Sequence, residues 1–341
     1  MRVPRPGRTT GSSSEGQIIL EVSEKRGIFS RSPFFGLLCN NGKGLLVGLA
    51  LCLLLGGCGN NGNNSPQETS TSGTLRISID ESFKPVIDSQ IKVFESSFPN
   101  VKVIAQYKPE AQCLRDLTTD STRMIIVTRG LSPDEEKFYQ DSFHLVPSMS
   151  PLAYDAVAVI VNNNAKDSVF EIDDIRAMLD GRDTVHKPVM DGRSATSTVR
   201  YAMDSILKGQ PLSKRVTAAN SSEEVINYVA ATPRAVGFIG VSWIGEGDPN
   251  QNMFLPNVKI ASLRCTSCGG ATYVKPYQAN IALHRYPLVR SLYYILKENF
   301  SGVGGNFANF LQYERGQLIF SKAFLWPVKM SFSIQQVQMT K

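Results

Sequence analysis

A cluster of hydroxyl side chains marks one short segment of the sequence as a place where an anion could bind. Residues 191–200 include Ser194, Thr196, Ser197 and Thr198, and they end in Arg200. The apolar residues that follow recur at helical spacing, so we expect the hydroxyls to lie at the start of a helix. Backbone N–H groups and the positive end of the helix dipole favour an anion there, and serine and threonine add neutral donors. A helix cap needs one hydroxyl, so four of them favour an oxyanion cradle over an ordinary Ser/Thr-rich turn.

Polar residues also follow three predicted strands in the preceding part of the chain. Residues 75–79 alternate, residues 101–107 alternate, and residues 124–127 form a continuous apolar run that indicates burial on both faces. Helical spacing between these strands predicts successive βα units and a parallel sheet, in which ligands bind at the carboxyl ends of the strands. The residues expected there are Ser82, Thr128 and Arg129 as ligand contacts, and Asp80 and Glu110 are further polar residues at the same strand ends. For Ser82, an ordinary helix-capping role is the alternative.

The common signatures of enzymes are missing from the sequence. It has three histidines and no G-x-S-x-G, HExxH or P-loop motif, so we expect no catalytic activity and no cofactor. Cys265 and Cys268 form one CxxC pair, which is half a zinc site. A local disulfide or two structural thiols is therefore favoured over a metal site, and the spacing leaves those two open.

Charge and composition argue against nucleic-acid binding. The chain has 341 residues and a formal net charge of +6, but seven of its 36 basic residues and three of its 30 acidic residues precede Cys58. The remainder carries 29 bases against 27 acids, too small an excess for a basic binding face. The length suits two domains.

The N-terminal part is typical of an exported, lipid-anchored protein. An uncharged apolar run of 12 residues, 44–55, is shorter than the roughly 20 that span a bilayer but suits a signal peptide. Leu55-Gly56-Gly57-Cys58 resembles the lipobox of bacterial lipoproteins, in which the cysteine is lipidated and becomes the new N-terminus. We thus expect a signal peptide with a long n-region at 1–57 and a flexible tether at 58–73. The folded part would lie outside the cytoplasm and contact the membrane only through the lipid on Cys58.

The order of these features along the chain is similar to that of the phosphate-binding substrate-binding proteins of ABC importers. The resemblance rests on the leader, the strand ending at Ser82, and residues 132–136, 155–161, 191–200, 235–240, 286–294 and 310–317. It implies an α/β, two-lobed type 2 periplasmic binding fold, with mainly parallel sheets flanked by helices and two hinge strands. Lobe 1 would comprise 74–153 plus 287–341, and lobe 2 would comprise 154–286. It also implies a monomer that captures phosphate or a related oxyanion between the lobes and delivers it to an ABC permease.

The resemblance places the phosphate loop on Ser194, Thr196 and their neighbours. Two departures concern the opposite side of the site: Arg129 stands where the family commonly has an aspartate, and residues 109–112 replace a Gly/Ser-rich turn. The aspartate matters because a carboxylate accepts the hydrogen bond of a protonated phosphate. Either Glu110 or Asp80 supplies the acceptor, or the site prefers a fully ionised oxyanion, or Arg129 pairs with Glu110 and the ligand differs. The alternative function is an extracytoplasmic sensor or surface interaction lipoprotein on the same fold, binding another small anion.

Overall fold

The computed structural model describes residues 68–119, 121–192, 196–244 and 258–329, all of which belong to the unit Asn64–Lys341. The expectations for the signal peptide, Cys58, most of the tether and Ser194 lie outside the described residues. The described part combines a large mixed sheet with helices, which confirms the α/β class.

The first part of the sheet has the parallel pairing expected from the βα units. β1 (Gly73–Asp80) lies between β2 (Val101–Lys108) and β3 (Met124–Val127) and is parallel to both. The 3₁₀ helix η1 (Glu81–Phe83) and α2 (Lys84–Ser97) connect β1 to β2, and α3 (Glu110–Asp116) connects β2 to β3. The carboxyl ends of the three strands therefore meet at one edge, with Asp80 opposite Lys108.

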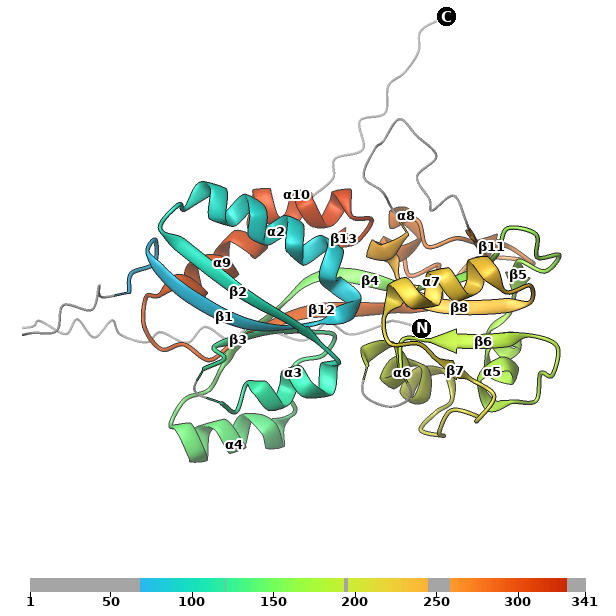
Figure 1. Ribbon diagram of the computed structural model, residues 1–341, viewed down its shortest axis with the longest axis horizontal. Helices are drawn as coiled ribbons and strands as arrows, with labels where there is room; N and C mark the ends of the chain where they lie inside the picture. The colour runs from blue at the N-terminus through green and yellow to red at the C-terminus, as the bar shows by residue number, and fades with distance from the viewer. Residues whose placement is uncertain (1–67, 120, 193–195, 245–257, 330–341) are drawn as a thin grey trace, which may run out of the picture. The chain divides into compact units, whose positions relative to one another are not determined.

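Two antiparallel strands continue this sheet. β12 (Val289–Leu296) lies between β3 and the 15-residue strand β4 (Ser148–Asn162). The second half of β4 pairs with β8 (Ala235–Gly240), which is followed in parallel by β6 (Lys187–Met190) and β7 (Thr217–Ala218). β9 (Val258–Ile260) and β13 (Trp326–Pro327) also pair with β4, so one ten-stranded sheet runs through β4 (Figure 1).

Helices cover both faces of the first part of the sheet. In Figure 1, α2, α9 (Val303–Gln312) and α10 (Glu314–Lys322) lie on one side of β1 to β3, and α3 and α4 (Pro133–Phe143) lie on the other. β3 shows why both are needed, because Met124 and Ile126 join the larger core cluster while Ile125 and Val127 join a second cluster with Leu117. The expected burial of this strand on both faces is confirmed.

The remaining elements surround the second part of the sheet. They are α5 (Ile172–Asp180), α6 (Ser197–Tyr201), the π-helix η2 (Ala202–Ile206), α7 (Ser222–Ala231), the 3₁₀ helix η3 (Val241–Trp243) and α8 (Gln278–Ala282). A separate small sheet comprises β5 (Val169–Phe170), β10 (Ser262–Arg264) and β11 (Tyr273–Val274). Directly after β10, a disulfide joins Cys265 to Cys268. Of the two alternatives that the CxxC spacing left open, a local disulfide or two thiols, the structure has the disulfide.

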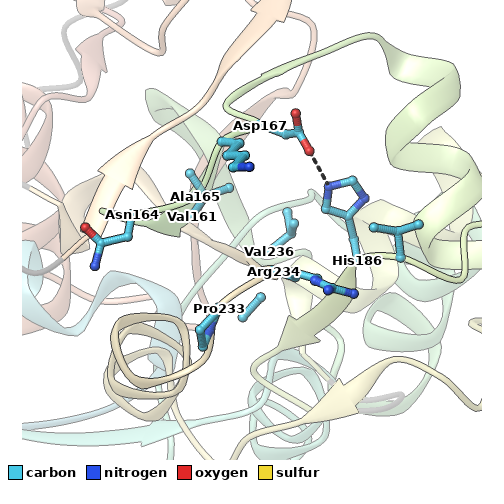
Figure 2. A pocket seen from close by; sticks show the side chains of 11 residues that line it. Val161, Asn164, Ala165, Asp167, His186, Pro233, Arg234 and Val236 are labelled. Atoms are coloured by element: carbon cyan, nitrogen blue, oxygen red, sulfur yellow. Dashed lines mark ion pairs between the residues drawn. The ribbon is translucent and has the colours of Figure 1, made fainter.

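A cavity of about 300 Å³ lies where β6 and β8 begin, beside the end of β4 (Figure 2). It is at the opposite ends of β6 and β8 from residues 191 and 240. Within the described ranges, no helix combines the length and apolar character needed to cross a bilayer.

Candidate functional site

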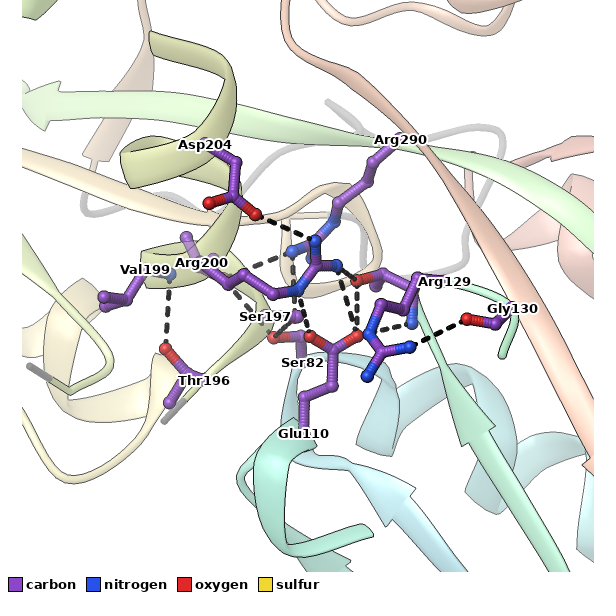
Figure 3. Close-up of polar contacts among 12 residues, drawn as sticks. Ser82, Glu110, Arg129, Gly130, Thr196, Ser197, Val199, Arg200, Asp204 and Arg290 are labelled. Carbon is purple, nitrogen blue, oxygen red and sulfur yellow. Dashed lines mark hydrogen bonds and ion pairs between the residues drawn. The ribbon is translucent and has the colours of Figure 1, made fainter. Parts of the chain in front are cut away.

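The Ser82 hydroxyl lies at the centre of a polar cluster drawn from distant parts of the sequence. Ser82 follows β1 in η1 and is fully buried, and its Oγ is 3.4 Å from Asp191 Oδ2, Ser197 Oγ and Thr198 Oγ1. Figure 3 shows Ser82 and Ser197 close together between the two parts of the sheet. Hydrogen bonds between oxygen atoms are usually about 2.5–3.0 Å long. The buried hydroxyl of Ser82 therefore makes only weak contacts with these three side chains.

A buried arginine completes the donors of this cluster. Arg290 on β12 donates from Nε to Asp155 Oδ2 at 2.8 Å and from Nη1 to Ser197 Oγ at 2.9 Å. Its Nη2 is buried and has no hydrogen-bond partner among the described residues. Burial opposes the charge, but the carboxylates of Asp155 and Asp80 raise the pKa of Arg290 above its ordinary value. A charged guanidinium with one unused donor thus lies beside the hydroxyls.

Carboxylates are in excess around this guanidinium. Asp80 accepts a hydrogen bond from the Ser82 backbone N–H through Oδ1 at 2.9 Å, whereas its buried Oδ2 has no partner in the described part of the chain. Burial, together with the charge of Glu110, raises the pKa of Asp80 to about 6. Burial also raises the pKa of Asp155 and of Asp191. The cluster therefore combines an unused donor on Arg290 with an unused acceptor on Asp80.

Glu81 extends the acidic side of the cluster towards α7. Its carboxylate accepts hydrogen bonds from the N–H and the hydroxyl of Ser222, at 3.3 and 3.1 Å, where α7 begins. Burial, and then the charge of Asp191, raises the pKa of Glu81 to about 7. Asp80 and Glu81, two neighbouring acids at the end of β1, are therefore both partly protonated near neutral pH.

A second group of expected site residues forms a closed network of its own. Arg200 Nε donates to Glu110 Oε2 at 2.6 Å, and Nη2 donates to the Thr128 hydroxyl at 2.7 Å. Thr128 in turn donates its N–H and hydroxyl to Glu110 Oε1, at 2.8 and 2.6 Å. Burial raises the pKa of Glu110, but the hydrogen bonds from Arg200 and Thr128 outweigh it, so the pKa lies below its ordinary value. Arg200 therefore supplies the positive charge that balances Glu110.

Thr196 has the ordinary role of a helix cap. Its hydroxyl accepts from the Val199 N–H at 3.3 Å and donates to Asp191 Oδ1 at 3.0 Å. The helix it caps, α6, passes directly into the π-helix η2. Such π-bulges are rare and often occur at functional sites. Here η2 follows immediately after the turn that carries Arg200.

The structure does not place Arg129 with the Ser82 cluster. Its guanidinium forms two hydrogen bonds of 2.7 Å to the carboxylate of Glu135. Those hydrogen bonds lower the pKa of Glu135 to about 2. Arg200, and not Arg129, is thus the arginine that pairs with Glu110.

Of the expected residues, the structure brings together Ser82, Ser197, Thr198 and Asp80, and places Glu110, Thr128 and Arg200 in the adjacent network. Sequence reasoning missed Arg290 and Asp155, which form a fully buried ion pair 135 positions apart in the chain. A signal was present, because each is a charged residue beside a largely apolar stretch of the sequence.

Comparison with known proteins identifies the fold. The model of the family described as PBP superfamily domain matches residues 64–315. A Clostridium perfringens protein described as a phosphate ABC transporter substrate-binding protein, solved with bound phosphate, aligns with a TM-score of 0.62 and 18% identity. The alignment covers 75% of this chain and 100% of that chain.

A Vibrio cholerae ABC-type phosphate transport receptor aligns with a TM-score of 0.55 and 17% identity, over 75% of this chain and 100% of that chain. A Corynebacterium glutamicum OxyR mutant aligns with a TM-score of 0.51 and 14% identity, over 82% of this chain and 73% of that chain. No curated protein matches the sequence. At these identities the structural likeness concerns the fold, and it confirms the expected type 2 periplasmic binding class. Because the family model covers most of its length, the chain belongs to the PBP superfamily.

Proposed function

We propose that the chain is a non-catalytic solute-binding lipoprotein that captures phosphate, or a related oxyanion, and delivers it to an ABC importer. One observation carries the proposal: the weakly bonded Ser82 hydroxyl, Arg290 Nη2 and Asp80 Oδ2 are all buried in one cluster. Buried polar atoms almost always have hydrogen-bond partners. A bound oxyanion would supply acceptors for Ser82 and Arg290.

The chemistry of the cluster favours an oxyanion that still carries a proton. Asp80, Asp155 and Asp191 surround the single guanidinium of Arg290, so a second full negative charge would add repulsion. Dihydrogen phosphate carries one negative charge and can donate an O–H to Asp80 Oδ2, whereas sulfate at neutral pH carries two charges and has no proton to donate. Asp80 would then have the role that the sequence left open between Asp80 and Glu110.

We also propose that Ser82 and the Ser197 loop lie on opposing lobes, 74–153 plus 287–341 and 154–286. The contacts of Ser82 at 3.4 Å join segments 109 to 116 positions apart, and they are weak enough for a ligand to replace. Binding would shift the population towards the form in which both lobes contact the anion. The lipidated Cys58 would hold this monomer at the outer side of a bacterial membrane, next to its permease.

The phosphate transport described for the Clostridium perfringens and Vibrio cholerae proteins supports this function. A second candidate, a sensor that binds a different small anion, is favoured by the closed network of Glu110, Thr128 and Arg200. Because these three side chains satisfy one another, fewer groups are left for a phosphate ion than the family pattern would provide.

Thermal unfolding of the full chain with phosphate, sulfate, molybdate and small carboxylates tests both candidates. A ligand at 100 times its dissociation constant should stabilise the fold by about 2.7 kcal/mol. Selective stabilisation by phosphate supports transport of phosphate, selective stabilisation by another anion supports the second candidate, and no response to any oxyanion would remove both.

Two variants locate the site. Replacing Ser197 and Thr198 together with alanine should abolish the phosphate response, because both hydroxyls contact Ser82 and Arg290. Ser205→Ala removes an exposed hydroxyl from η2 and serves as the matched control. Thr196 is unsuitable, since loss of its cap would cost about 1 kcal/mol of stability by itself. An unchanged affinity in the double variant would show that the anion binds elsewhere.

A further inference from the structure

The cavity at the start of β6 and β8 has the walls of a small ligand site. Its lining is mainly aliphatic, with Val161, Val185, Pro233 and Val236 contributing side chains from three separate segments. Figure 2 shows Val161, Pro233 and Val236 around the cavity. Ligand pockets are mostly apolar with a few polar groups, and they range upward from about 300 Å³. At about 300 Å³, this cavity suits a molecule smaller than a typical drug.

The polar groups of the cavity include two cations. Lys166 and Arg234 line it, and neither side chain has an ion pair or hydrogen bond within the described part of the chain. The acid in the lining, Asp167, lies 3.8 Å from Nε2 of His186. The other ring nitrogen of His186 is 2.6 Å from Asp183. Lys166 and Arg234 exceed the one acid of the lining, Asp167, by one positive charge, which fits a monoanion.

Arg234 also has an uncommon backbone conformation. Arg234 lies in the turn between α7 and β8 with φ of 65°, a left-handed conformation that glycine or asparagine adopts at lower cost. Strained backbone of this kind is a reason to look for function, because other residues would fit the turn better. In Figure 2 the Arg234 side chain extends along the cavity towards the side on which His186 lies.

From this geometry we propose that the cavity is a second ligand site, which binds a small aliphatic carboxylate. The guanidinium of Arg234 would bind the carboxylate through paired hydrogen bonds, Lys166 would add a point charge, and the valines would enclose the aliphatic part. The site is separate from the Ser82 cluster. β6 lies between them, from Lys187 to Met190, and a strand rises about 3.3 Å per residue, so roughly 16 Å of chain separates His186 from Asp191.

The test is calorimetric titration of the full chain with hexanoate, hexanol and hexyl phosphate. We expect saturable binding of hexanoate, at least about tenfold weaker binding of hexanol because it lacks the charge, and weaker binding of the dianionic hexyl phosphate. Absence of saturable hexanoate binding, or equal binding of hexanol, would overturn the proposal. Tighter binding of hexyl phosphate would overturn the assignment to a carboxylate.

Two glycine variants separate the charge from the backbone effect. Arg234→Gly should weaken hexanoate binding by roughly ten- to a hundredfold, the value of a charge-assisted hydrogen bond. Lys208→Gly is the matched control, because Lys208 is also an exposed cation at positive φ, 53°, but does not line the cavity. Equal affinities in these two variants would refute the role of Arg234.

Two further variants test the role of Lys166 and the independence of the two sites. Lys166→Ala removes the other cation without altering a strained turn, so it should also weaken hexanoate binding. Ser197→Ala should leave hexanoate binding unchanged while it weakens the phosphate response, so the two sites can fail independently. Loss of hexanoate binding in Ser197→Ala would show that the carboxylate binds at the Ser82 cluster.

Discussion

The buried carboxyl group of Asp80 should make the stability of the folded chain depend on pH. Burial is the main reason that the pKa of Asp80 rises from 3.8 to about 6, and the charge of Glu110 raises it further. An acid with a raised pKa binds its proton more tightly in the folded than in the unfolded chain. The folded state is therefore favoured at low pH, and stability is lost as the pH rises from about 4 to about 6.

The Asp80→Asn variant isolates this effect, because asparagine has the same shape and does not titrate. Its side-chain oxygen can still accept from the Ser82 N–H, as Asp80 Oδ1 does at 2.9 Å. A rise of roughly two pKa units corresponds to about 3 kcal/mol. The stability of the variant relative to the natural chain should thus increase by up to about 3 kcal/mol between pH 4 and pH 7. Glu81 titrates in both chains, but the charge of Asp80 contributes to its raised pKa. Loss of that charge lowers the Glu81 pKa in the variant, which adds to the relative stabilisation in the same direction.

Urea unfolding of both chains at several pH values, without phosphate, gives the comparison. Asp134→Asn is the control, since Asp134 is an exposed acid in the first turn of α4. A constant difference in unfolding free energy between pH 4 and pH 7 would refute the assignment of a raised pKa to Asp80. The same variant should lose the phosphate response, because an amide N–H₂ replaces the acceptor proposed for the phosphate proton.

Urea unfolding at pH 7 also tests one prediction about packing and two about ion pairs. Gly237→Ala should cost about 1–3 kcal/mol, because the new methyl group would lie 2.7–2.9 Å from three aliphatic side chains. Gly269→Ala has no neighbour within 4 Å and should leave stability nearly unchanged, so similar losses in both would contradict the packing argument. Arg290→Gln should cost about 3–5 kcal/mol by leaving Asp155 buried without its partner, and adding Asp155→Asn should restore part of that loss. Glu110→Gln should cost about 1–3 kcal/mol, since Arg200 loses its charged acceptor; no measurable change would mean that the pair adds no stability.

Local sequence patterns predicted most of the fold, because the alternation or spacing of apolar residues within each segment indicates whether it forms a strand or a helix. Alternation in β1, the apolar run of β3 and the helical spacing of α2 each need only neighbouring residues, and the parallel pairing follows from successive βα units. The pairing of Arg129 with Glu135 could also have been predicted from the sequence. Ser132 and Glu135 have the spacing of a capping box, which fixes the carboxylate that binds Arg129 only six positions away.

The polar core of the site was less predictable because it depends on long-range pairing. Crowded hydroxyls identified Ser197 and Thr198, but nothing near Arg290 in the sequence indicates that Asp155, 135 positions earlier, would be its partner. Only the antiparallel register of β12 and β4 sets the two residues opposite each other. A buried ion pair is costly to assemble, and one well-packed apolar pair could replace it without loss of stability. The unused donor of Arg290 is therefore assigned to the proposed ligand rather than to folding, and a high-affinity phosphate response that survives Arg290→Gln would contradict that proposal.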